Sequence, residues 1–138
     1  MSLLEIGAVL LLVVVIFSAA RGKVRINARE VSDLEARLRP AADAVVAVRA
    51  SGKAEREEWD DGSAEFEAYV RGLDLPDGSE IEFVVDGVTV GRVPTRSGKA
   101  RLDYDSREGD DVPPIAEDQR LVVRHQGADL LEGSFRPD

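Results

Sequence analysis

The segment "DYDSREGDD" gathers five carboxylates within nine residues, and carboxylate oxygens are ligands that Ca²⁺ prefers. The spacing differs from that of an EF-hand loop, because Gly109 falls at the wrong offset and no helical pattern flanks the segment. A solvated acidic loop is the simpler interpretation, also for "WDDGS" at residues 59–63. Calcium is therefore a weak candidate and we expect no cofactor. The candidate calcium ligands are Asp103, Asp105, Glu108 and Asp110, with Asp111 beside them.

Catalytic residue types are sparse in this chain. His125 is the only histidine, and it lies in a strand-like run beside Arg124, where a structural or surface role is the ordinary one. The sequence has no cysteine, no His, Asp and Glu cluster at metal-ligand spacing, no G-x-S-x-G motif and no glycine-rich phosphate loop. Trp59 suits either an exposed contact or packing on a sheet. We therefore expect that the protein is not an enzyme.

Charge is distributed unevenly along the chain. The net charge is −9, yet residues 21–40 hold six Lys and Arg against three Asp and Glu, and residues 41–138 hold twelve against twenty-three. An acidic domain repels phosphates, which argues against nucleic-acid binding. Arg21, Lys23 and Arg25 form a basic collar between an apolar segment and the acidic domain. We expect this collar to contact acidic surfaces of neighbouring copies.

Residues 1–20 are apolar except for a few small polar side chains and one charged residue, Glu5. As a helix, the segment measures about 30 Å at ~1.5 Å per residue, which is enough to cross the hydrocarbon core of a bilayer. A cleaved signal peptide is one interpretation, although no Lys or Arg precedes Arg21. A plain membrane anchor is a second. In that case Glu5 lies at the interface, and the basic residues after the helix predict a cytoplasmic β domain.

A third interpretation gives Glu5 a function. The order Met1, Ser2, Leu3, Leu4 and Glu5, followed by "IGAVLLLVVVIFSAA", resembles the mature N-terminus of the type IV pilin superfamily. The resemblance implies that a basic leader is removed and that Glu5 neutralises the methylated Met1 amine of a neighbouring subunit in a filament core. A buried carboxylate without a partner costs several kcal/mol, and a buried pair costs far less. The assembly residues are then Met1, Glu5, Leu10, Leu11, Leu12, Val14, Ile16, Arg21, Lys23 and Arg25.

Two features depart from the pilin pattern. Pilins continue the first helix as a long amphipathic segment, whereas here Gly22 follows at once and "KVRIN" alternates like a strand. A proline near the end of the apolar segment, common in pilins, is absent. We expect a structural subunit that partners with copies of itself in a helical filament. It would lie in the membrane before assembly and on the cell surface afterwards. The alternative is a single-pass anchored β-sandwich that acts as a binding or envelope protein.

The chain from residue 23 onward alternates like a series of β-strands. A strand over residues 33–39 that ends at Pro40 is favoured over a short helix, and residues 129–135 supply the last strand. Asp86-Gly87, between two alternating runs, predicts a type I′ hairpin. Other turns are expected at residues 51–52, 61–63, 76–79, 97–98 and 113–114. The expected inward positions are Phe66, Ala68, Val70, Ile81, Phe83, Val85, Ala100, Leu102, Tyr104, Leu121 and Val123.

The predicted fold is a single N-terminal apolar α-helix followed by a mainly-β domain. The domain is expected to be a small antiparallel sandwich or barrel of seven or eight strands, since turn signals recur at the spacing typical of such folds. Three regions are expected: a hydrophobic transmembrane or assembly helix at 1–22, the basic collar and first strand at 23–40, and an acidic β-sandwich head at 41–138.

Overall fold

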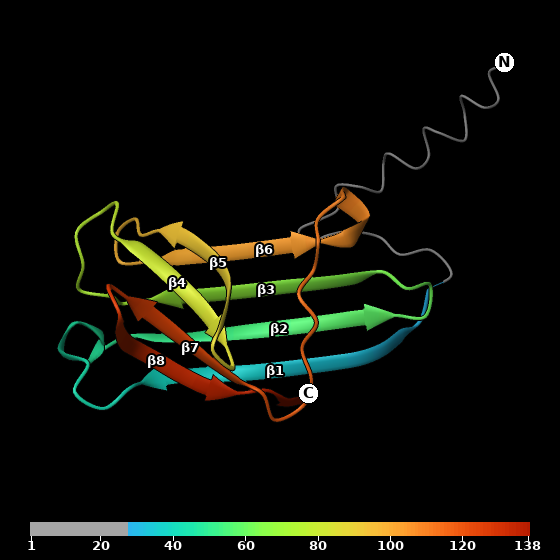
Figure 1. Ribbon diagram of the computed structural model, residues 1–138, viewed down its shortest axis with the longest axis horizontal. Coiled ribbons are helices and arrows are strands. Elements are labelled where there is room, and N and C mark those ends of the chain that lie inside the picture. The colour runs from blue at the N-terminus through green and yellow to red at the C-terminus, as the bar shows by residue number, and fades with distance from the viewer. Residues whose placement is uncertain (1–27) are drawn as a thin grey trace, which may run out of the picture.

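The computed structural model describes residues 28–138, and these form a mainly-β domain (Figure 1). The expected apolar helix at 1–22 and all the expected assembly residues, from Met1 and Glu5 to the collar, lie outside the described residues. Within residues 28–138, helical structure is confined to two single-turn 3₁₀ helices. The elements are β1 (Glu30–Pro40), η1 (Val45–Ala47), β2 (Ser51–Trp59), β3 (Ala64–Arg71), β4 (Glu80–Val85), β5 (Val88–Pro94), β6 (Ala100–Asp105), η2 (Ser106–Glu108), β7 (Arg120–His125), β8 (Ala128–Ser134) and β9 (Arg136–Pro137).

The strands form one antiparallel sheet in the hydrogen-bonded order β5-β4-β7-β8-β1-β2-β3-β6, with the short β9 paired to β1. In Figure 1, β4, β5, β7 and β8 cross over β6, β3, β2 and β1, so that the sheet curls round on itself. β5 and β6 contact each other at the remaining seam without forming a backbone ladder. The domain is therefore a nearly closed barrel, which confirms the expected small antiparallel β domain.

Apolar side chains that alternate along the strands fill the barrel, because successive side chains of a strand point to opposite faces. Phe66 of β3 and Phe135, between β8 and β9, are fully buried, with ring centroids 6.4 Å apart. The expected inward positions are confirmed except for Tyr104, which is only partly buried. Its hydroxyl donates to the carbonyl oxygen of Val90 at 2.9 Å. This hydrogen bond connects β6 to β5 across the seam, and it explains why the hydroxyl of Tyr104 lies at the edge of the core.

Type I′ turns connect neighbouring strands. Asp86 and Gly87 join β4 to β5 with φ values of 46° and 85°, as the hairpin prediction required. Gln126 and Gly127 join β7 to β8 with φ values of 49° and 80°. This second turn was not among the expected ones, because Gln is an uncommon residue at a left-handed position.

The predicted turn at Ser51-Gly52 is wrong, because both residues belong to β2. The chain reverses before them, over residues 41–50 and the single turn η1. Gly52 is needed for close packing rather than for a turn: a Cβ there would lie 2.5 Å from the carbonyl oxygen of Tyr69 and 2.9 Å from Cγ1 of Val70. The first strand also runs further than expected, from Glu30 to Pro40 rather than over 33–39.

Candidate functional site

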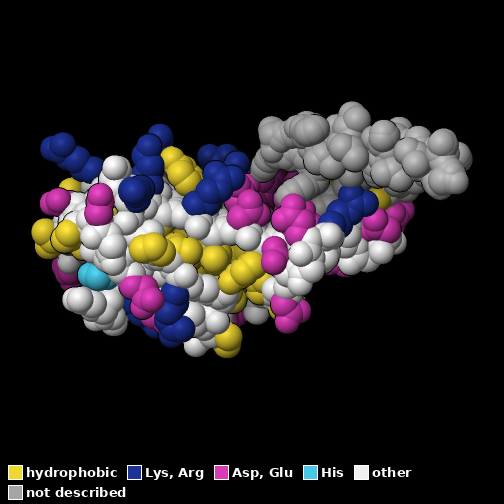
Figure 2. All heavy atoms as spheres, turned by 90° about the horizontal axis from the view of Figure 1, so that it is seen from above, with side chains coloured by type: hydrophobic (Ala, Val, Ile, Leu, Met, Phe, Trp, Pro, Cys, Tyr) yellow, Lys and Arg dark blue, Asp and Glu magenta, His cyan; other side chains and the backbone are white. Residues whose placement is uncertain are grey.

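The outward side chains of β1, β2, β3 and β6 separate into an acidic half and a basic half. Odd-numbered residues of these strands point outward, except for the buried Asp105 at the end of β6, and the antiparallel register aligns them in rows across the strands. We call this surface the charge-divided face. Along the upper margin of the domain in Figure 2, Lys and Arg gather on the left and Asp and Glu lie to their right. The acidic rows are Asp33, Glu57 and Glu65, then Glu35, Glu55, Glu67 and Asp103; the basic rows are Arg37, Lys53, Tyr69 and Arg101, then Arg39, Ser51 and Arg71.

Carboxylates crowd the acidic half, at the end of the face where β1 begins. Burial, together with the charges of Glu57 and Asp33, raises the pKa of Glu55 to about 7. Burial also raises the pKa of Asp33, whose Oδ1 is enclosed without a hydrogen-bond partner among the described residues. Burial and the neighbouring Asp33 raise the pKa of Glu30. The acidic half therefore favours the approach of positive charge.

Two groups of carboxylates in this half bring oxygens within 4.8 Å of one another. Glu30, Asp33 and Glu57 form one group, and Asp33, Glu55 and Asp138 form the other. Each group supplies three carboxylates, whereas Ca²⁺ takes about six to eight oxygen ligands. By themselves, the described residues thus offer only part of a coordination shell. Sequence reasoning missed these groups because they join β1, β2 and the C-terminus, which lie far apart in the chain.

Two of the expected calcium ligands, Asp105 and Asp110, accept hydrogen bonds from the backbone of their own loop. Asp105 is buried, and its Oδ1 accepts a hydrogen bond from the Arg107 amide at 2.8 Å, which caps η2. Oδ2 of Asp110 accepts from the Asp105 amide at 2.9 Å. Asp103 belongs to the charge-divided face opposite Glu67. The structure thus joins Asp105 with Asp110 and does not bring Asp103 and Glu108 into one ligand group with them.

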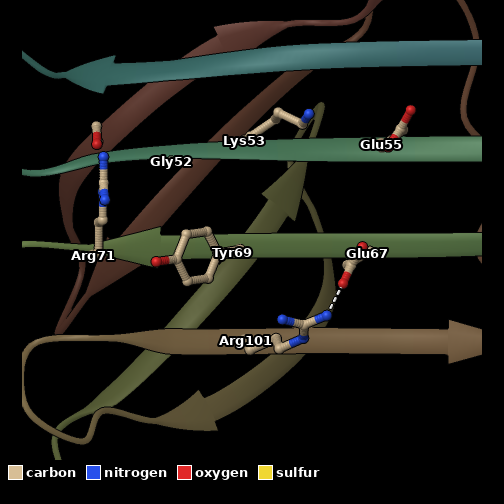
Figure 3. A pocket seen from close by; sticks show the side chains of 8 residues that line it. Gly52, Lys53, Glu55, Glu67, Tyr69, Arg71 and Arg101 are labelled. Atoms are coloured by element: carbon tan, nitrogen blue, oxygen red, sulfur yellow. Dashed lines mark hydrogen bonds and ion pairs between the residues drawn. The ribbon is translucent and has the colours of Figure 1, made fainter. Parts of the chain in front are cut away.

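Ion pairs connect the acidic and basic halves along their boundary. Nζ of Lys53 lies 3.1 Å from Glu35, which raises the pKa of Lys53, and Nε of Arg37 lies 3.4 Å from the same carboxylate. Arg101 of β6 pairs with Glu67 of β3, as the dashed line in Figure 3 marks. The charges next to the boundary are therefore compensated within the domain.

The outer basic row is not compensated in this way. Arg39 and Arg71 form no ion pair with another residue of 28–138. Beside Arg71, an open hollow of about 600 Å³ lies over β2, β3 and β6. Figure 3 shows its lining, in which the ring of Tyr69 lies between Arg71 and Glu67 along β3. The hollow is shallow and open to solvent, which suits a protein surface contact better than the enclosure of a small substrate.

The remaining residues singled out in the sequence have ordinary surroundings. Nδ1 of His125 lies 3.0 Å from the carbonyl oxygen of Glu80, at the end of β7. Trp59 is half buried at the end of β2, and its amide donates to the carbonyl oxygen of Ser63 at 2.9 Å. His125 also lines an open hollow of about 530 Å³, together with Glu82, Arg92 and Arg124. Trp59 lines neither this hollow nor the one over β2, β3 and β6, and neither residue belongs to a group of candidate metal ligands within residues 28–138.

The strongest candidate for a functional site is thus the charge-divided face, which is a surface rather than a cavity. Over residues 28–138, no helix has the length and apolar character that crossing a membrane requires. Comparison of the chain with models of protein families and with curated proteins finds no match.

Proposed function

We propose that this chain is a structural subunit of a pilin-like extracellular filament. Its apolar N-terminal helices bundle in the filament core, and its β-barrel heads lie on the outside. The observation that carries this proposal is the order "MSLLE" ahead of an apolar run. The charge-divided face adds that the heads suit contact with another protein that carries both signs. The obvious protein of that kind is another copy of the same chain.

Glu5 sets the stagger between the helices in this proposal. The "MSLLE" order places one carboxylate close to the N-terminal amine in an otherwise apolar segment. An amine and a Glu four residues later lie about 6 Å apart along a helix axis, at ~1.5 Å per residue. Staggering two helices by about this distance brings the Met1 amine of one chain to Glu5 of the next. The pair fixes one register, much as a single polar residue does in a coiled coil.

Removing this carboxylate tests the proposal. We expect Glu5→Ala to prevent filament formation, because the amine of the neighbouring chain then has no partner in the apolar core. Electron microscopy of surface filaments is the measurement, and far-UV circular dichroism checks that the barrel still folds. Glu117→Ala is the matched control, since Glu117 is an exposed carboxylate in the loop before β7. Normal filaments from Glu5→Ala would contradict the role of Glu5.

A single-pass anchored binding protein is the second candidate. The hollow beside Arg71 favours it, because this cation forms no ion pair with another residue of 28–138 and suits an anionic group of a ligand. The two candidates differ in where the protein is found. A filament subunit is recovered from sheared surface material, with a methylated N-terminal amine in mass spectrometry. An anchored binding protein stays in the membrane fraction as separate molecules.

A further inference from the structure

We propose that the charge-divided face is a docking surface for the same face of a second copy, with the strands of the two copies antiparallel. The proposal rests on the proposed function, which supplies both the second copy of this chain and the filaments that the pairing would join. A second copy is the partner that fits, because the face is complementary in charge to itself. Rotation about a two-fold axis along the rows places the basic half of each copy on the acidic half of the other.

The row register decides where the two-fold axis lies. The boundary between the acidic and basic rows falls at Ala36 in β1, Ala54 in β2, Ala68 in β3 and Leu102 in β6, which are neighbours in the ladder. With the two-fold axis along this line, a residue that lies a given number of positions before the boundary faces the residue that lies the same number of positions after it in the second copy. Each strand then faces the same strand of the second copy, running in the opposite direction.

This arrangement places every cation of the face opposite an anion or beside one. On β2, Lys53 faces Glu55 of the second copy, and on β3, Arg71 faces Glu65. The outer basic row gains the most new ion pairs, because Arg39 and Arg71 have no ion pair within residues 28–138 of their own copy. The alternative two-fold axis, along the strands, would lay like charges on one another and is disfavoured. The remaining facing pairs are Arg37 with Glu35, Arg39 with Asp33, Arg101 with Asp103, Tyr69 with Glu67 and Ser51 with Glu57.

The size of the face indicates a weak and salt-sensitive interface. Six residue-to-residue steps along the strands and three spacings between the four strands give about 20 Å by about 15 Å, at ~3.3 Å per residue and ~4.8 Å between strands. This area, about 300 Å², is less than half of the ~800 Å² per partner that a standard interface buries. The face is also polar, with Tyr69 as its main apolar group. Pairing of single heads is therefore weak, and many heads held in two arrays pair far more firmly through multivalency.

The direction of the chains decides what the pair connects. β1 begins at the acidic end of the face, so antiparallel pairing puts the starts of the two β1 strands at opposite ends of the pair. Subunits of one filament share one orientation. We therefore infer that the face joins heads of two separate, oppositely directed filaments, so that it bundles filaments rather than building them.

A charge-exchange experiment tests the pairing. In variant A, Lys53→Glu and Arg71→Glu place like charges opposite Glu55 and Glu65 of the second copy. In variant B, Glu55→Lys and Glu65→Lys place like charges opposite Lys53 and Arg71. Self-association of the full chain in a non-ionic detergent is measured by sedimentation equilibrium at low salt. The expected result is a dimer dissociation constant at least about tenfold weaker for A alone and for B alone. A 1:1 mixture of A and B should associate at least as tightly as the unaltered chain, which excludes misfolding as the cause.

A control and a second readout separate this inference from the filament proposal. Arg92→Glu with Arg96→Glu changes the net charge as variant A does, but on β5 and the segment after it, and should leave pairing unchanged. In microscopy, variant A should form single filaments where the unaltered chain forms bundles. Filaments absent from every variant would count against the filament proposal alone. Self-association of A or B equal to that of the unaltered chain, or a mixture no better than either variant, would overturn the pairing.

Discussion

At the scale of single residues, Glu55 carries the clearest electrostatic consequence. Its carboxyl lies on β2 among other carboxylates, and burial raises its pKa from 4.5 to about 7. The folded chain therefore holds this proton more tightly than the unfolded chain does. The resulting stabilisation is complete below the unfolded pKa of 4.5 and is lost as the pH rises through about 7. The charged groups around Glu55 are Asp33, Glu35, Lys53, Glu57, Glu67 and Asp138.

Glu55→Gln should accordingly stabilise the barrel at pH 8, because a neutral amide replaces an ionised carboxylate in a crowded acidic row. We expect a gain of about 1 kcal/mol in the free energy of unfolding, after allowance for partial contact with solvent. The gain should disappear below about pH 4.5, where the native side chain is protonated in both states. Urea unfolding at the two pH values measures it.

The control for this prediction is Glu117→Gln, an exposed carboxylate away from the acidic rows. It should change the free energy of unfolding by less than about 0.5 kcal/mol at either pH. A loss of stability in Glu55→Gln at pH 8 would mean that favourable contacts hold the ionised carboxylate, and would contradict the destabilising crowding of Glu55.

At the scale of elements, Gly133 decides how closely β8 approaches β1. A Cβ on Gly133 would lie 2.2 Å from the carbonyl oxygen of Arg37, which is backbone and has little room to move. Gly133→Ala should therefore push the two strands apart and cost about 1–3 kcal/mol of stability, as overpacking does. Thermal unfolding followed by circular dichroism gives the loss.

Gly127→Asn is the matched glycine control. Gly127 has a φ of 80° in the turn between β7 and β8, and a Cβ there meets nothing within 4 Å. Asn tolerates left-handed backbone better than other side chains, so the loss should stay below about 1 kcal/mol. Equal losses for the two variants would show that backbone freedom, and not the approach of β8 to β1, is what Gly133 supplies.

Much of the barrel was accessible from the sequence because its strands alternate strictly. The pattern at Phe66, Ala68 and Val70 identified β3 and its inward face, and Asp86-Gly87 identified the hairpin between β4 and β5. Gly52 was misread because a glycine required by close packing and a glycine required by a turn look alike in a sequence. Only the approach of the Tyr69 carbonyl distinguishes them.

The candidate site was much less accessible, because it is a property of register. Acidic residues at alternate positions, such as Glu55 and Glu57 or Glu65 and Glu67, were visible in the chain. The sequence does not show which strands lie beside one another, and the rows of charge could therefore not be predicted. Asp105 and Asp110 show the reverse case, because they are close in sequence and so suggested a shared calcium ion. In the structure, both carboxylates accept hydrogen bonds from backbone amides of their own loop.

At the scale of the whole molecule, the acidic and basic halves give the barrel a direction. The acidic end lies where β1 begins, and the basic end lies at the opposite ends of the same four strands. Copies of such a molecule can associate head to tail or face to face. Increasing salt weakens both modes of association, since charges further apart than about 10 Å are screened at ~0.1 M. Orientation is therefore the property that distinguishes the proposed antiparallel pair.

Chemical cross-linking measures that orientation most directly. The chain has no cysteine, so Ser51→Cys and Glu57→Cys each introduce a single thiol, on opposite sides of the proposed axis on β2. Facing sheets lie about 10 Å apart, while positions 51 of the two copies are separated by about 20 Å along the strands. A bismaleimide that spans about 10 Å therefore reaches from residue 51 only to residue 57 of the second copy. We expect dimers when the two variants are mixed at low salt and few dimers from either variant alone. A yield from the mixture no higher than that from each single variant would contradict the antiparallel pairing of the charge-divided face.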